Sequence, residues 1–199
     1  MADQIILASS SLIRAKLLQN AGVTCEIVPG RIDEISIIRA LEAEDASARD
    51  IADTLAEMKA RKVAEKGVGS LVLGCDQVLS FKGSILSKPE TAKDACNQLR
   101  ILRGETHQLL SAAVVYEGLK PVWRYVGVAK LTMRDFSDDY LNAYVDRNWD
   151  SICSSVGCYK IEEEGLRLFR MIQGDTFTIQ GLPLLELLSY LTLRGTLPT

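Results

Sequence analysis

The sequence predicts an α/β fold in which a mixed β-sheet carries helices on its faces. Apolar segments of strand length alternate loosely with longer segments of helical periodicity. Short turns also join neighbouring strand segments into hairpins, which a regular doubly wound parallel sheet would not contain. The 199 residues are enough for a single domain over 1–199, or for two closely joined lobes, with a buried core.

The first third of the chain is expected to begin with two strands and a helix between them. Gly22 follows the first helical segment and Gly67 follows the second, where a left-handed residue commonly ends a helix. In order, the expected elements are a strand over 5–8, a helix from about 12 to 21, a strand over 24–28, an irregular acidic segment over 29–46 and a helix from about 47 to 66.

The rest of the chain is expected to hold two hairpins and three helices. Lys82-Gly83 turns the strand that begins at Leu71, and Glu117-Gly118 turns a longer hairpin. Thr91 resembles the first residue of a capping box, and Pro183 suits the first position of the last helix. The expected elements are a strand from 71 to the first turn, a return strand over 85–86, a helix over 91–103, strands over 108–116 and 122–133, a helix from 137 to about 148, strands near 156–161 and 166–172, and a helix over 183–194.

Composition and charge exclude several classes of protein. The net charge is −3, so no basic field favours nucleic acid or an anionic membrane as partner. The N-terminal stretch MADQIILASSS lacks the basic and apolar regions of a signal peptide. No apolar run approaches the roughly 20 residues that a membrane span needs. We therefore expect neither a membrane nor a nucleic-acid partner.

The cysteines and the single histidine limit the redox and metal chemistry. Five cysteines, an odd number without a CxxC pair, favour free thiols in a cytoplasmic protein. His107 is the only histidine, which excludes the common zinc motifs. Cys153 and Cys158 have no further ligands near them and are expected to be small buried residues.

Asp76 interrupts the apolar strand LVLGCDQVLSF at 71–81. Burying an unpaired carboxylate is costly, so such an acid is usually paired, metal-bound or functional. Asp33 and Glu34 are two further candidate acids, although a solvated loop is the plainer interpretation of this pair. Carboxylates of this kind suit Mg²⁺ or Mn²⁺, which commonly bind through one or two acids and substrate phosphates.

Three serines stand between the first strand and the first helix, in ILASSSLIRAKLL at 6–18. The free amides and the positive dipole of a helix N-terminus bind anions, and Arg14 lies in the first turn. Plain N-capping by Ser10 or Ser11 would also explain the serines and is slightly favoured from this motif alone.

Two lysines are candidate phosphate ligands. Lys59 shares the apolar stripe of Leu55 and Val63, so it is either functional or a snorkelling lysine at the edge of that stripe. Lys88 precedes Pro89, which restricts its backbone, but an ordinary exposed lysine is the plainer interpretation.

Several enzyme classes lack their sequence signatures. The chain contains no P-loop, no dinucleotide-binding GxGxxG and no GxSxG nucleophile elbow. A Ser or Cys triad could use only His107, and no nucleophile motif supports one. A phosphatase of the haloacid dehalogenase type needs a second acid two residues after the first, where this chain has Val78.

The candidate residues together resemble one family, the Maf or septum-formation-inhibitor-like nucleotide pyrophosphatases. The resemblance covers essentially the whole chain. The matching segments are LASSSLIRAKLL at 7–18, IDE at 32–34, MKARKVA at 58–64, GCDQV at 74–78, ILSKP at 85–89, GETH at 104–107 and GLPL at 181–184. Their order and spacing are specific to the family.

The resemblance implies an elongated mixed sheet flanked by helices, with two lobes around a substrate cleft, in a homodimer. It also implies hydrolysis of a nucleoside triphosphate to monophosphate and pyrophosphate with a divalent metal, Mg²⁺ or Mn²⁺. The family's catalytic acid falls on Asp76, and Glu34 joins it at the metal. The phosphate-binding positions fall on Ser9, Ser11, Arg14, Lys59 and Lys88.

Base choice in the family follows three positions, which fall on Ile13, Gln77 and Glu162. Gln77 and Glu162 are similar to those of members that hydrolyse 7-methyl-GTP, whereas Ile13 replaces an aromatic residue. A carboxylate only accepts hydrogen bonds, which suits the paired donors of guanine. The alternative is that Glu162 is one of three solvated acids. The chain also departs from the family at Leu12 and Thr178.

Two functions are compatible with these residues. One is a house-cleaning pyrophosphatase in which Asp76 is a general base, a metal ligand or both. The other is a non-catalytic nucleotide-binding regulator of cell division that uses the same serines and lysines. The acids favour the enzyme, because binding alone needs no positioned carboxylate.

Overall fold

The computed structural model describes residues 5–67 and 71–198 as a mixed α/β chain. The strands are β1 Ile5–Leu7, β2 Cys25–Ile27, β3 Leu71–Phe81, β4 Ser84–Leu86, β5 Thr106–Glu117, β6 Lys120–Met133 and β7 Phe169–Gln173. The helices are α1 Leu12–Asn20, α2 Glu34–Ala43, α3 Ala48–Ala64, α4 Ala92–Leu102, α5 Asp138–Ile152, α6 Thr176–Ile179 and α7 Leu184–Leu193, with 3₁₀ turns η1 Val156–Cys158 and η2 Glu164–Leu168.

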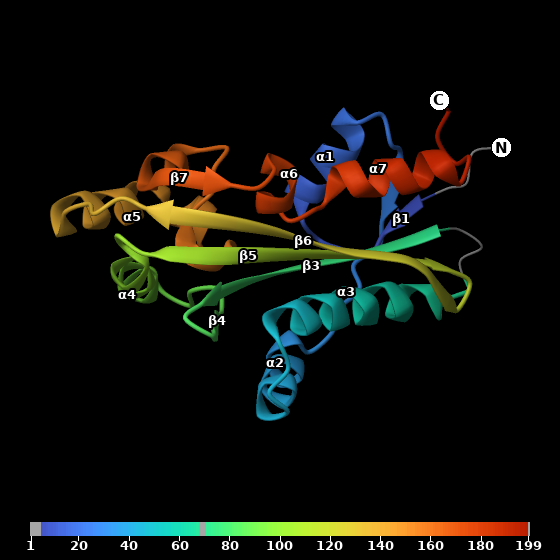
Figure 1. Cartoon of the computed structure of the whole chain (residues 1–199), viewed down its shortest axis with the longest axis horizontal. Helices are drawn as coiled ribbons and strands as arrows, with labels where there is room; N and C mark the ends of the chain where they lie inside the picture. Colours follow the sequence, from blue (N-terminus) through green and yellow to red (C-terminus); the bar gives the residue numbers. More distant parts are fainter. Residues whose placement is uncertain (1–4, 68–70, 199) are drawn as a thin grey trace. The chain divides into compact units, whose positions relative to one another are not determined.

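The strands form a mixed sheet in the order β2-β1-β3-β5-β6-β7, with β4 paired to β3 (Figure 1). β1 is parallel to both β2 and β3, whereas β4 is antiparallel to β3 and β7 is antiparallel to β6. Two-residue turns at Lys82-Gly83 and Gly118-Leu119 join the hairpins, and both glycines have positive φ. The predicted mixed sheet with hairpins is confirmed.

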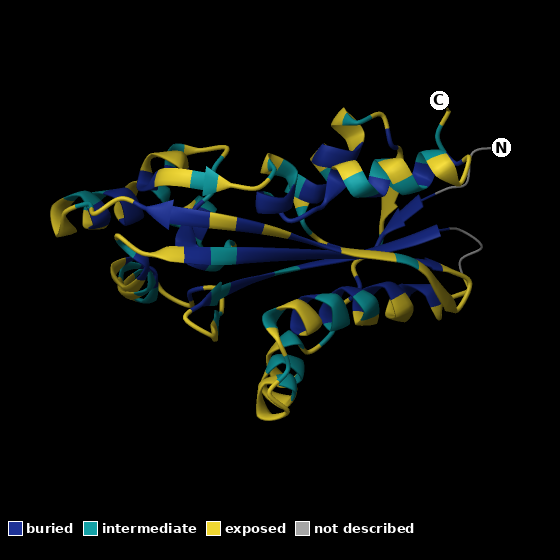
Figure 2. Cartoon of the chain, in the orientation of Figure 1, coloured by how far each residue is buried: buried dark blue, intermediate teal, exposed yellow. Residues whose placement is uncertain are grey.

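The chain divides into two compact units. Unit 1 comprises Met1–Gln77, Leu110–Gly127 and Thr176–Thr199, and unit 2 comprises Val78–Leu109 and Val128–Asp175. In unit 1 the buried residues of β1 and β3 pack with α1 and α7, with Leu7, Leu18, Leu73 and Leu187 at most 1% exposed. Figure 2 shows the buried residues along these strands and on one side of the helices.

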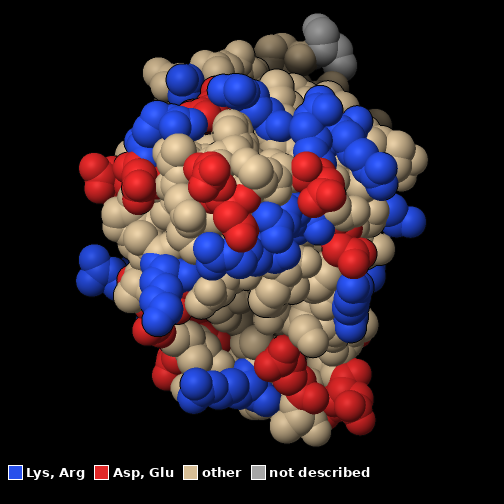
Figure 3. Space-filling view, turned by 90° about the vertical axis from the view of Figure 1, so that its left-hand side faces the viewer, with Lys and Arg blue, Asp and Glu red and all other residues tan. Residues whose placement is uncertain are grey.

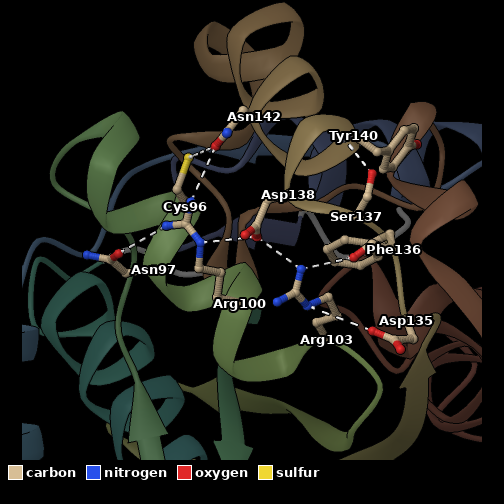
Figure 4. A network of polar contacts seen from close by, with 10 residues as sticks. All are labelled: Cys96, Asn97, Arg100, Arg103, Asp135, Phe136, Ser137, Asp138, Tyr140 and Asn142. Carbon is tan, nitrogen blue, oxygen red and sulfur yellow. Dashed lines mark hydrogen bonds and ion pairs between the residues drawn. The ribbon is translucent and has the colours of Figure 1, made fainter.

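Unit 2 joins α4 to α5 through a polar network at the start of α5 (Figure 4). Arg100 and Arg103 both bond Oδ1 of Asp138, at 3.3 and 3.0 Å, and Arg103 also donates to the Phe136 carbonyl at 3.0 Å. Asp138 lies in the first turn of α5, where a carboxylate is favoured by the helix dipole. The capping box of Thr91 and Asp94 is present at the start of α4, as predicted.

The single histidine is a buried structural residue of unit 2. His107 is 1% exposed, and its Nε2 bonds the Tyr159 hydroxyl at 2.7 Å. Burial lowers the pKa of His107 to about 4, so the imidazole is neutral near pH 7. His107 is therefore a neutral member of an aromatic cluster with Tyr159 and Phe169.

Charges of both signs alternate on the surface. On the face in Figure 3, Lys and Arg side chains are interspersed with Asp and Glu. Ion pairs join several oppositely charged side chains of the chain, for example Arg124 with Asp53 at 2.6 Å and Arg147 with Glu164 at 2.7 Å. Within the described ranges, no helix is long and apolar enough to cross a membrane.

Five expectations from the sequence were wrong. Cys153 is only partly buried, whereas Cys158 is buried as expected. The irregular segment 29–46 contains the helix α2, because Asp33 caps it and accepts from the Ser36 amide at 3.1 Å. No strand forms near 156–161, since Gly157 and Cys158 have positive φ and belong to η1. The strand expected over 166–172 begins later, at Phe169. Pro183 is the cap of α7, one residue before its first position.

Candidate active site

Three charged side chains of unit 1 meet beside the middle of β3. Asp76 is 6% exposed, and its Oδ1 accepts a hydrogen bond from Nζ of Lys59 on α3, which is 8% exposed. The same Nζ lies 2.7 Å from Oε1 of Glu34, the first residue of α2. Two carboxylates therefore share one buried ammonium group. Asp76, the acid within the apolar strand, is paired with Lys59.

Two glycines allow this approach. A Cβ at Gly74 would overlap the Ala56 carbonyl oxygen, so β3 packs directly on the α3 backbone two residues before Asp76. A Cβ at Gly30 would lie 2.5 Å from the Lys59 carbonyl oxygen, so the segment before α2 also contacts α3 at this point. Both contacts require a residue without a side chain, and they bring the segments that carry the two acids close to α3 at Lys59.

Burial sets the electrostatics of Asp76. Desolvation raises the pKa of Asp76, and the positive charges of Lys59 and Arg14 oppose that rise. The direction is upward overall, so the carboxyl group is a stronger base than an exposed aspartate. A raised pKa in a carboxylate that faces cations is typical of a functional acid rather than a surface charge.

Arg14 and Ser9 form a second cluster next to Asp76. Arg14 Nη1 donates to the Ser9 hydroxyl at 3.1 Å and to the Cys75 carbonyl at 3.0 Å, while Nε donates to the Gly181 carbonyl at 2.7 Å. Arg14 is 8% exposed, and the carbonyl that it binds belongs to the residue before Asp76. The arginine is thus fixed in direction, with its positive charge close to the carboxylate.

The serines are not simple helix caps. Ser11 is the N-cap residue of α1, but its side chain makes no capping hydrogen bond. Ser9 is 7% exposed; it binds Arg14 and accepts from the Ser11 amide at 3.2 Å. The Ser11 hydroxyl and the start of α1 lie beside this cluster without a capping role. The slight preference for plain capping was therefore wrong for Ser11.

Lys59 is not a snorkelling lysine. A snorkelling side chain would carry its ammonium group out to water, whereas Nζ of Lys59 lies between two carboxylates and is buried. Of the acidic pair, Asp33 caps α2 and only Glu34 reaches the lysine. Hydrogen bonds from Ser36 hold the pKa of Asp33 below its usual range, as expected for a capping carboxylate.

Lys88 and Glu162 lie in unit 2, both exposed. Gln98 Nε2 donates to the Ser87 carbonyl at 2.9 Å and fixes the backbone before Lys88. Neither Lys88 nor Glu162 makes an ion pair with another described residue. The neighbouring acids do: Glu164 binds Arg147, which helps lower the pKa of Glu164 to about 2, and Glu163 lies 3.7 Å from Lys160. The roles of Lys88 and Glu162 stay predictions.

Gln77 and Ile13 lie in unit 1 with Asp76. Gln77 Nε2 donates to the Ser111 hydroxyl at 2.9 Å and to the Thr178 and Ile179 carbonyls at 3.1 and 2.9 Å. The amide donors therefore hold the C-terminal segment against β3, and Oε1 accepts no hydrogen bond from the part of the chain that the structure describes. Ile13 is half-buried on α1, between Ser11 and Arg14.

A divalent cation fits the acids present. Among the described residues, no three His, Cys, Asp or Glu side chains gather as a metal site. Asp76 and Glu34 instead supply two hard oxygen donors around one positive charge. Two protein carboxylates completed by substrate oxygens and water are a usual arrangement for Mg²⁺.

Comparisons with known proteins identify the family of the chain. The family described as Maf-like protein matches residues 4–193. A nucleoside triphosphate pyrophosphatase of Roseobacter denitrificans is 62% identical over 198 residues, which cover 100% of both chains. One of Ruegeria pomeroyi is 56% identical over 199 residues, again 100% of both. A 7-methyl-GTP pyrophosphatase of Brucella abortus is 44% identical over 191 residues, 96% of each. The chain therefore belongs to the Maf family.

Proposed function

We propose that this enzyme, a nucleoside triphosphate pyrophosphatase, cleaves its substrate at the α-phosphorus with Asp76 as general base. The products are a nucleoside monophosphate and pyrophosphate, and removal of unwanted nucleotides is a house-cleaning role. The observation that supports this most is the buried Asp76 carboxylate between Lys59 and the fixed Arg14. A binding protein would gain nothing from an acid repelling its anionic ligand.

Each step has a group in unit 1 to perform it. Ionised Asp76 accepts a proton from a water molecule while the water oxygen bonds the α-phosphorus. The bond from that phosphorus to the bridging oxygen breaks, and pyrophosphate leaves with the bonding electrons. Arg14, Lys59 and the amides at the start of α1 stabilise the negative charge on the transferred and leaving groups. Ser9 and Ser11 add hydroxyl donors, and Lys88 is proposed as a further phosphate ligand.

Asp76 and Glu34 are proposed to hold a divalent cation, Mg²⁺ or Mn²⁺. Such an ion would neutralise phosphate charge and polarise the phosphoryl oxygens. Lys59 already places one positive charge between the two acids, and this charge opposes the rise in the pKa of Asp76. The divalent cation and the Lys59 ammonium group would therefore bind the same two carboxylates, those of Asp76 and Glu34.

A nucleotide panel tests the activity. We expect pyrophosphate release from at least one nucleoside triphosphate when Mg²⁺ or Mn²⁺ is present, and little release after chelation. The panel includes dTTP, UTP, GTP and 7-methyl-GTP, with released pyrophosphate as the measured product. Tight binding of nucleotides without turnover of any would support the non-catalytic regulator instead.

The proposed base is 7-methylguanine. Glu162 is exposed and has no partner among the described residues, unlike its two acidic neighbours, so its carboxylate is available to a ligand. A carboxylate accepts from the N1–H and N2–H₂ donors of guanine, and methylation at N7 adds a positive charge to the base. Gln77 Oε1 is a second acceptor for the donors of a base.

We expect 7-methyl-GTP to exceed dTTP, UTP and unmodified GTP in kcat/KM. A Glu162→Gln variant should reduce the difference in transition-state free energy between 7-methyl-GTP and the other nucleotides by roughly 1–3 kcal/mol, because one charged contact is replaced by a neutral one. Glu163→Gln is the matched control, since Glu163 already binds Ser151. Equal turnover of UTP and 7-methyl-GTP by the unaltered enzyme would contradict this base assignment while leaving the pyrophosphatase intact.

The cellular compartment and the oligomeric state of the enzyme are also proposals. All five cysteines are free, which suits the reducing cytoplasm. The family resemblance supports a homodimer, which light scattering at several concentrations would test. The nucleoside triphosphate is the one partner that the site requires.

A further inference from the structure

A pocket lies in unit 1 close to the charged centre formed by Asp76, Lys59 and Glu34. Its volume is about 420 Å³, and it is formed by the segment after β2 and the C-terminal part of α3. The lining residues are Val28, Pro29, Arg31, Lys62 and Lys66. We refer to this set as the basic pocket.

The basic pocket has positive charge without compensation. Three of its lining residues are cationic and none is acidic, and none of the three cations forms an ion pair within residues 5–67 and 71–198. Arg61, the neighbour of Lys62, pairs with Glu65 at 2.9 Å. A helix C-terminus by itself favours a lysine such as Lys62, but it does not explain Arg31, which comes from a different segment.

Both walls of the basic pocket lead to the charged centre. Gly30 stands between Pro29 and Arg31, and it packs on the α3 backbone at Lys59. Lys62 follows Lys59 by three residues on α3, which makes the two side chains neighbours on the helix surface, and Lys66 follows two residues after the helix ends at Ala64. The other wall contains Arg31. Glu34 follows three residues later and forms an ion pair with Lys59. The pocket and the centre therefore adjoin through two separate segments.

We propose that the basic pocket binds the terminal phosphates of the substrate and then the pyrophosphate that they become. The proposal rests on the pyrophosphatase activity proposed above and names the place of the leaving group. Hydrolysis at the α-phosphorus transfers negative charge to the β- and γ-phosphates, so cations next to the centre stabilise the departing product. An anion unrelated to the reaction would not need a site whose Lys62 lies one helical turn from Lys59.

The test removes the charges of the basic pocket. In Lys62→Ala/Lys66→Ala and in Arg31→Ala, we expect pyrophosphate to bind on the order of ten times more weakly, because each exposed contact to a charged group contributes modestly. The same variants should lower kcat/KM for a triphosphate more than for the matching diphosphate, which lacks the γ-phosphate. Lys120→Ala, an exposed lysine on β6 of the same unit, is the matched control and should change neither value.

Calorimetric titration with pyrophosphate separates this inference from the activity itself. Weaker binding in the two variants and not in Lys120→Ala supports the pocket even if no tested nucleotide is turned over. Unchanged pyrophosphate affinity in both variants overturns it, even in an active pyrophosphatase. Pyrophosphate inhibition that is noncompetitive with the triphosphate would also overturn it, because the site would then be separate from the substrate's.

Discussion

An Asp76→Asn variant is expected to keep the fold and lose on the order of 10²- to 10⁴-fold in kcat, the usual contribution of a positioned general base. Asparagine has nearly the same shape, and its side-chain oxygen can still accept from Lys59. It cannot take a proton from water at neutral pH, and it is a poor metal ligand. Steady-state release of pyrophosphate measures the loss.

The pH profile gives an independent check on Asp76. Only the ionised carboxylate accepts a proton, so activity should fall as the pH drops through the pKa of Asp76. Burial raises that pKa, so the acid limb of kcat/KM should lie above the ordinary aspartate value of about 3.9. The limb should be absent from any residual activity of Asp76→Asn.

As the pH rises, the contribution of Asp76 to the stability of the folded chain should fall, whereas its contribution to activity should rise. Because the pKa of Asp76 is raised in the folded state, the folded chain binds more protons than the unfolded chain between the two pKa values. The contribution of this group to stability is therefore lost as the pH rises through that window. Asp76→Asn removes the buried charge, so its melting temperature at pH 7 should stay within a few degrees of the unaltered enzyme.

Asp33→Asn is the matched control for the loss of one acid. Asn caps a helix as well as Asp does, and Asp33 bonds Ser36 rather than Lys59. We expect this variant to retain turnover and stability. Near-normal turnover by Asp76→Asn would refute the base role, and the phosphate-binding residues would then need another general base.

The residues nearest to Asp76 could be predicted because their signals are local. Asp76 is a charged residue within an apolar strand, and Lys59 is a charged residue within an apolar helical stripe. Both can be recognised from a short stretch of sequence. The structure explains both at once, since each charge compensates the other. A local contradiction in the pattern was therefore the strongest functional signal in this chain.

Other features depend on contacts that no local pattern specifies. The Gly181 carbonyl that fixes Arg14 is 167 positions away in the sequence. Gly157 lies where a Cβ would be 2.5 Å from Leu79, a distant strand residue, and its positive φ excludes the strand expected there. These residues could be placed only once the tertiary packing was known.

The helix α2 was missed for a different reason. Its segment has no buried residue, so its apolar positions do not form the core-facing stripe that identifies most helices. Asp33 followed by Ser36 was the available signal, because a cap of this kind marks a helix start. Recognising it would have placed Glu34 in the first turn, at a defined position rather than in a solvated loop.

Replacing Lys59 is expected to cost both activity and stability. Lys59 is buried between two carboxylates, so its loss affects the folded state as well as the proposed phosphate site. In Lys59→Met the stem is kept and the charge is removed, leaving Asp76 and Glu34 without their shared partner. Breaking a buried pair in this way costs about 3–5 kcal/mol in the free energy of unfolding.

Activity should fall independently of stability. The transition-state free energy derived from kcat/KM should rise by about 1.5–3 kcal/mol, the usual contribution of a hydrogen bond to a charged group. Loss of the ammonium group also removes a charge that lowers the pKa of Asp76, so the acid limb of the pH profile should move upward. Urea unfolding and pyrophosphate release measure the two effects on one preparation. A variant that unfolds more easily yet keeps its turnover would make Lys59 a structural residue only.

The double variant Lys59→Met/Asp76→Asn separates the two roles of the lysine. With residue 76 neutral, the loss of the ammonium group leaves one fewer buried carboxylate without its partner, so much of the lost stability should return. Turnover should not return, because the base is absent and one phosphate ligand is missing. The coupling of the two substitutions in unfolding free energy then measures the buried pair itself. If the two losses simply add, Lys59 and Asp76 do not depend on each other in the folded enzyme, contrary to the contact between them.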